Sequence, residues 1–159
     1  MPLPKKEKVY TRQEALLKIS SFCAYQERTQ QEVRDKLYEY GLHKDVVEEL
    51  VSELISGNFI NEERFAKTYA GGKFRIKHWG KVKIKEALKA KGLSDYCIRK
   101  GLQEIEPKDY LAALQSLIRK RSEKEKEKNE YRRKHKIAAY LIAKGYEAEL
   151  VWEELVDGF

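Results

Sequence analysis

A dense cluster of basic residues is the feature of this chain that best indicates what kind of partner it binds. From Lys73 to Lys91 there are eight basic residues and one acid, a net charge of +7. The whole chain has the same formal net charge, so the rest of it carries equal numbers of acidic and basic groups. Lysines concentrated in this way favour an anionic partner, such as a nucleic-acid backbone or an acidic protein surface.

Aromatic residues lie beside these charges. Phe74 and Trp79 precede a stretch in which Lys81, Lys85 and Lys89 recur every four residues, which places the three lysines on one face of a helix. Two interpretations are open. The lysines bind phosphates and the rings stack on bases, or the lysines form a solvated helix face and the rings belong to the core.

A second basic cluster in the last third of the chain, including Arg119–Arg121, contains interleaved glutamates and is a weaker signal. We predict that residues of both clusters bind a protein partner or nucleic acid: Arg75, Lys77, Lys81, Lys83, Lys85, Lys89, Arg132, Arg133 and Lys134.

The sequence contains no recognisable catalytic or metal-binding motif. His43, His78 and His135 are far apart and belong to no HxxxH or HExxH pattern. Gly71-Gly72-Lys73 lacks the upstream glycine and the following Ser or Thr of a phosphate-binding loop. We therefore expect a binding protein, not an enzyme, with no cofactor or metal.

The composition predicts a helical, soluble protein. Charged residues make up 37% of the chain, well above the usual quarter, and there are only three prolines and nine glycines. No signal peptide or membrane-length apolar stretch is present, so we expect a cytoplasmic protein. We expect a monomer, because no apolar stripe is left obviously unsatisfied. Cys23 and Cys97 have no CxxC partner, and Cys97 is predicted to be a buried apolar residue.

An internal repeat determines the predicted architecture. Gly41, Gly92 and Gly145 each close a similar segment, and they recur at intervals of about 50 residues. We predict an all-α fold, an elongated and curved array of three tandem three-helix repeats. The predicted divisions are a flexible tail over 1–9 and repeats over 10–60, 61–106 and 107–159.

Local signals predict the helix ends in the first repeat. Apolar spacing indicates a helix from about Arg12 to Gln26. Thr29 followed by Glu32 fits a capping box, and Gly41 suits a left-handed residue after the next helix.

In the second repeat we expect Asn61 to cap a helix that breaks or bends at Gly71-Gly72. In the third, Pro107 fits the first turn of a helix. The Glu–Lys tract at 123–130 is compatible with either a solvated helix or a loop.

Four segments, in order, resemble the bacterial regulatory protein RecX family. Arg28–Leu37 is similar to its R-[ST]-x-x-E-[LV]-x-x-K-L element. Gly57–Tyr69 is similar to its G-x-[IL]-[DN]-[DE]-x-R-F-A-x-x-[YF] element, with one extra residue after the glycine. Gly80–Gly92 matches G-x-x-x-I-x-x-x-L-x-x-K-G, and Lys136–Tyr146 is similar to its final repeat. Where the family often has aspartate, Asn61 and Glu62 stand here, and the Glu–Lys tract matches no motif.

The resemblance implies a non-enzymatic modulator of the RecA recombinase. Members of the family lie in the groove of the RecA–single-stranded DNA filament and restrain ATP hydrolysis, strand exchange and co-protease activity. The alternative hypothesis, based on the +7 segment alone, is an autonomous basic helical module that binds nucleic acid directly.

Overall fold

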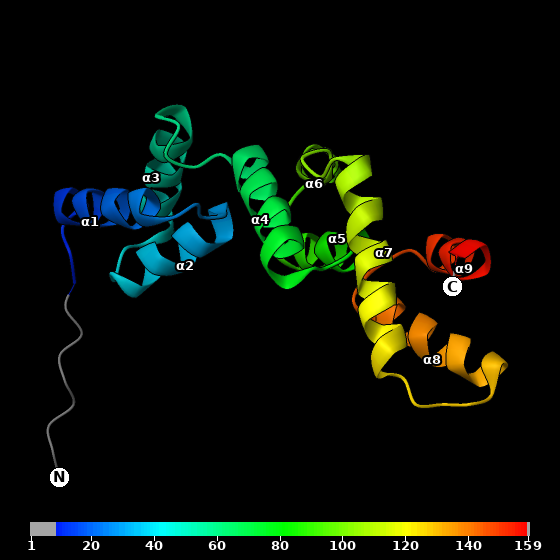
Figure 1. Ribbon diagram of the computed structural model, residues 1–159. Coiled ribbons are helices and arrows are strands. Elements are labelled where there is room, and N and C mark those ends of the chain that lie inside the picture. The colour runs from blue at the N-terminus through cyan, green and yellow to red at the C-terminus, as the bar shows by residue number, and fades with distance from the viewer. Residues whose placement is uncertain (1–8, 159) are drawn as a thin grey trace, which may run out of the picture. The chain divides into compact units, whose positions relative to one another are not determined.

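The computed structural model describes residues 9–158, and this part of the chain is all-α, with nine helices and no strand (Figure 1). The predicted tail over 1–9 lies outside the described residues except for Val9. The chain divides into two compact units, one up to Phe65 and one from Ala66 onward. The predicted all-α, three-repeat fold is confirmed.

The first repeat consists of α1 (Arg12–Tyr25), α2 (Gln30–Glu39) and α3 (Lys44–Ser56). Capping boxes at Thr11 and Thr29 start α1 and α2, as the sequence predicts for Thr29. In each box the threonine hydroxyl accepts from a backbone N–H of the first turn, where the helix has no other acceptor.

The core of this repeat comes from the inward faces of all three helices. Ile19 of α1, Leu37 of α2, and Leu50 and Leu54 of α3 are fully or almost fully buried. Their burial draws together helices that are each too short to be stable alone in water.

The second repeat consists of α4 (Glu62–Lys77), α5 (Lys81–Ala90) and α6 (Asp95–Leu102). Asn61 caps α4, because its Oδ1 accepts from the backbone N–H of Arg64 at 2.9 Å.

Of the break or bend predicted at Gly71-Gly72, the break is wrong, because α4 continues through both glycines to Lys77. Phe65, Ala66, Ala70 and Phe74 are buried along one side of α4. Their burial offsets the cost of two glycines in a helix, about 1 kcal/mol each.

The third repeat consists of α7 (Pro107–Lys124), α8 (Glu130–Ala143) and α9 (Ala148–Gly158). Pro107 occupies the first turn of α7, as predicted. The Glu–Lys tract divides between the two conformations that its sequence allows: α7 extends to Lys124, and 125–129 form the connection to α8.

The three repeat glycines share one conformation. Gly41, Gly92 and Gly145 have φ angles of +81°, +84° and +103°, so the left-handed conformation predicted for Gly41 is confirmed and recurs at the other two. The prediction that Cys97 is buried is wrong. It is only partly buried, because its position near the start of α6 leaves one side open to solvent.

Candidate functional site

The basic segment folds into the second half of α4, a short turn and α5, and Trp79 in the turn lies between its lysines. The Nζ atoms of Lys73 and Lys83 lie 4.9 and 4.6 Å from the centre of the Trp79 ring. Trp79 is half-buried, whereas Phe74 is buried. Cation–π attraction therefore gathers two lysines from different helices around one partly exposed indole.

The three lysines predicted to share a face of α5 differ in their surroundings. Lys81 is half-buried, with its Nζ 4.7 Å from the centre of the Tyr110 ring and its backbone N–H donating to the Tyr110 hydroxyl at 3.0 Å. Lys85 and Lys89 are exposed. Arg75 and Lys77, near the end of α4, are also exposed, and Lys83 is half-buried.

The turn before α5 is held by the third repeat. His78 directly follows α4 and has a φ of +58°, and its carbonyl accepts from the Tyr146 hydroxyl at 3.1 Å. The Gly80 N–H donates to the Lys144 carbonyl at 2.8 Å, and the Val82 N–H donates to the Gly145 carbonyl at 2.9 Å. Backbone contacts this close require residues without side chains, and both Gly80 and Gly145 lack one.

Two buried tyrosines complete this junction. The ring centres of Tyr110 and Tyr146 are 5.1 Å apart, and the Tyr110 hydroxyl donates to Glu147 Oε1 at 2.5 Å. Burial raises the pKa of Tyr146 to about 12, and burial together with the Glu147 hydrogen bond raises the pKa of Tyr110 further. Both hydroxyls therefore remain protonated donors at neutral pH.

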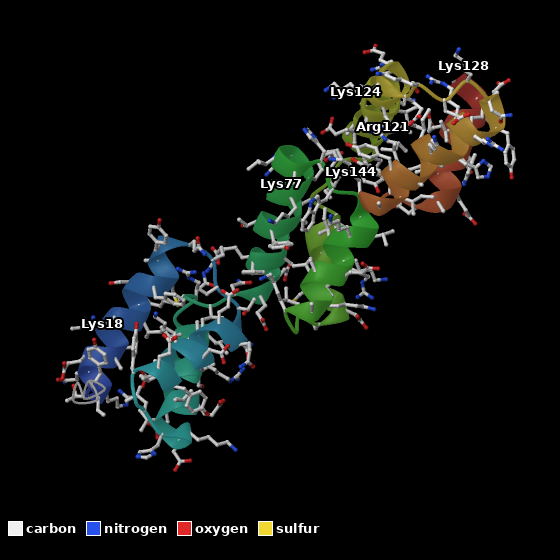
Figure 2. The ribbon with its side chains drawn as sticks, turned by 90° about the horizontal axis from the view of Figure 1, so that it is seen from below. Lys18, Lys77, Arg121, Lys124, Lys128 and Lys144 are labelled. Atoms are coloured by element: carbon white, nitrogen blue, oxygen red, sulfur yellow. The ribbon has the colours of Figure 1, made fainter. Side chains whose placement is uncertain are left out.

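A second cation–aromatic group adjoins the first. Tyr140 is exposed on α8, with the Arg121 guanidinium 4.6 Å and the Lys144 Nζ 5.8 Å from its ring centre. Lys144 also donates to the Lys77 carbonyl at 3.4 Å. Figure 2 shows Lys77, Lys144 and Arg121 near one another, with Lys124 and Lys128 farther along toward the connection after α7.

These contacts bring together basic residues that are distant in sequence where the second and third repeats meet, with Lys77 taking part through its backbone carbonyl. We call this cluster the basic junction, and it consists of Lys73, Lys77, Lys83, Arg121 and Lys144. The sequence analysis missed Lys144 and Tyr140 as site residues, and it placed Lys73 and Arg121 in the basic clusters without predicting them to bind a partner. The available signals were that Lys144 and Tyr140 both lie in the segment similar to the final RecX repeat, and that Lys144 directly precedes a repeat glycine, as Lys91 does.

The predicted residues of the third repeat have different surroundings. Arg132 is exposed, and Lys134 pairs with Glu130 at 3.7 Å. Arg133 is half-buried and donates to the carbonyls of Ser122 and Glu125, which ties the end of α7 to the start of α8. Arg133 thus has a structural role, and binding by this group stays a prediction.

Within residues 9–158, no three His, Cys, Asp or Glu side chains are grouped closely enough to hold a metal ion. The described helices also include none with the length and apolar character that crossing a membrane requires.

The fold and the basic junction define a tandem three-helix repeat protein with cations concentrated where its last two repeats meet. Models of the first, second and third three-helix domains of RecX match residues 18–54, 61–102 and 108–155, in that order. The chain belongs to the RecX family.

Relatives and solved structures agree with this assignment. Regulatory protein RecX of Bacillus cereus (strain B4264) is 30% identical over 148 residues, which is 91% of this chain and 55% of that protein. The Clostridium perfringens (strain 13 / Type A) protein of the same name is 33% identical over 122 residues, 76% of this chain and 57% of that protein. The chain therefore spans about half the length of these relatives.

A crystal structure of RecX from Lactobacillus salivarius has the same fold, with a TM-score of 0.84 and 23% sequence identity. The match covers 92% of this chain and 95% of that one.

Proposed function

We propose that this protein is a non-enzymatic regulator that binds the RecA filament on single-stranded DNA and inhibits its ATP hydrolysis, strand exchange and co-protease function. Through this inhibition it regulates recombination, DNA repair and the SOS response. The observation that carries the proposal is the ordered match of three RecX domains to residues 18–155. The name Regulatory protein RecX, which its relatives bear, supports a regulatory role.

The basic junction supports an anionic surface as the partner. Its lysines and Arg121 come from α4, α5, α7 and the end of α8, so they present several separated charges rather than one pocket. Separated charges suit an extended polyanion or an acidic protein surface. Many individually weak contacts suit reversible regulation. We further propose that the protein is a cytoplasmic monomer, with repeats bounded at 10–60, 61–106 and 107–159.

The test is RecA ATP hydrolysis on single-stranded DNA, titrated with this protein at constant salt. We expect inhibition well below one molecule per recombinase subunit. If hydrolysis falls only when the DNA itself is saturated, the protein competes for phosphates and the proposal is wrong.

The alternative is direct binding to nucleic acid, and the exposed Lys85 and Lys89 favour it. In that case affinity for single-stranded DNA falls with salt, with a log–log slope of about −0.7 per phosphate neutralised. A Lys85→Glu/Lys89→Glu variant would lose that affinity. The matched control, Lys44→Glu/Lys108→Glu, makes the same charge change at exposed positions of α3 and α7 and would keep it. Equal binding by both variants excludes the α5 lysines as the DNA-binding surface.

A further inference from the structure

An open groove on the first repeat lies outside the basic junction. Its volume is about 520 Å³, and it is formed by one side of α1, the segment after α1 and the end of α2. The lining residues are Leu17, Lys18, Ser21, Phe22, Tyr25, Arg28 and Tyr40.

The α1 side of the groove carries apolar side chains that the core does not use. Ile19 and Cys23 turn inward and are buried, whereas Leu17 and Tyr25 are 74% and 83% exposed. These two residues are eight positions apart, which spans about 12 Å of helix. Large apolar side chains gathered on an open groove are typical of an interaction site.

The groove also holds two cations. The Arg28 guanidinium lies 3.7 Å from the centre of the Phe22 ring, and its Nε donates to the Phe22 carbonyl at 3.1 Å. Lys18 lies on α1, as Figure 2 shows, with its Nζ 4.9 Å from the Tyr10 ring centre. Neither cation forms an ion pair within the described part of the chain.

No carboxylate lines this groove. The carboxylates of α1, α2 and their connection are engaged elsewhere, in capping boxes, hydrogen bonds and ion pairs: Glu14, Glu27, Glu32, Asp35 and Glu39. The charge of the groove is therefore uncompensated, and Arg28 is already held in position by Phe22. A cation held in position loses little conformational entropy when it binds a carboxylate.

We propose that this groove binds a short acidic peptide segment of a partner protein. A large apolar side chain of the segment packs on Leu17, Phe22 and Tyr25, and its carboxylates pair with Arg28 and Lys18. A nucleic-acid backbone complements the cations but offers nothing to cover Leu17. The inference is independent of the proposed function, because it concerns the first repeat and requires neither a recombinase nor DNA.

The test uses the full chain and a fluorescein-labelled amphipathic helical peptide of about three turns, with leucines on one face and glutamates beside them. Fluorescence anisotropy should show micromolar binding, on the order of 10 μM. A peptide with every glutamate replaced by glutamine should bind about tenfold more weakly, and so should a peptide with serine in place of leucine.

Lys18→Glu and Leu17→Ser are the informative protein variants. Both positions are exposed, so the melting temperature, monitored by circular dichroism, should not change. Each variant should weaken binding of the acidic peptide about tenfold. Lys44→Glu, an equal charge change at an exposed position outside the groove lining, should bind like the unaltered protein.

Three results would overturn the proposal. The first is equal binding of the acidic and glutamine peptides, or no binding of either at about 1 mM. The second is loss of acidic-peptide binding in a Lys85→Glu/Lys89→Glu variant, which would place the peptide on α5. The third is concentration-dependent self-association that Lys18→Glu abolishes, which would make a second copy of the chain the occupant.

Discussion

Replacing Gly145 by alanine tests whether backbone contact between the second and third repeats holds the basic junction together. An added Cβ would lie 2.3 Å from Lys83 Cβ and 2.9 Å from the Gly80 carbonyl oxygen, both closer than non-bonded atoms approach. The φ of +103° is also unfavourable for any residue with a Cβ. The substitution therefore has a conformational cost and a steric cost.

The two costs can be separated with Gly92→Ala. Gly92 has a similar φ of +84°, but an added Cβ there would meet nothing within 4 Å. We expect Gly92→Ala to lower the free energy of unfolding by about 1–2 kcal/mol, from backbone strain alone. Gly145→Ala should lower the free energy of unfolding by about 1–3 kcal/mol more than Gly92→Ala does, because the chain must shift to relieve the overlap with Lys83.

The assay is urea unfolding of the full chain followed by circular dichroism. Equal losses in the two variants, within about 0.5 kcal/mol, would refute the argument that the repeats meet at Gly145. Gly80→Ala adds a second check: its φ of −77° is ordinary, but its Cβ would lie 2.2 Å from the Gly145 carbonyl carbon. Both alanines disrupt the same contact, the one between Gly80 and Gly145. The double variant should therefore lose less unfolding free energy than the sum of the two single variants.

Three further predictions concern particular side chains. Thr29→Ala should lower the free energy of unfolding by about 1–2 kcal/mol in urea titrations, because the capping hydroxyl is almost fully buried; an unchanged midpoint would contradict this. The pKa of Tyr146 is raised to about 12 in the folded protein, which therefore binds more protons than the unfolded chain above the ordinary tyrosine pKa of about 10. Stability should accordingly fall as pH rises from 10 to 12, and Tyr146→Phe should reduce that fall while losing the hydrogen bond to the His78 carbonyl. Cys97, partly exposed, should react with a thiol reagent in the native state, whereas burial raises the pKa of Cys23 and should delay its reaction until the protein unfolds; similar rates for both thiols would count against the burial of Cys23.

Features that depend on neighbouring residues in the chain were predictable. The capping box at Thr29, the cap at Asn61 and the left-handed Gly41 each follow from a side chain or a φ angle within one helical turn. The repeat and its three-helix plan follow in the same way, because the spacing of apolar residues alone determines which side of each helix is buried. Local backbone chemistry is sufficient for these features, so they could be predicted from the sequence alone.

Features that depend on distant segments were not predictable. Helix α4 continues through Gly71-Gly72 because its apolar side is buried by other elements. The Arg133 guanidinium donates hydrogen bonds to carbonyls at the end of α7. The exposed groove of α1 has the same origin, since only the packing of the first repeat leaves Leu17 outside the core.

The basic junction is the clearest example of a feature that depends on tertiary packing. Lys77 and Lys144 are far apart in sequence, and local periodicity says nothing about their separation in space. They meet because Gly80 and Gly145 let two backbones approach to hydrogen-bonding distance, which brings the end of α8 against the end of α4. The number of cations and the helices that carry them can be read from the sequence, whereas their grouping in space depends on the packing of the second repeat on the third.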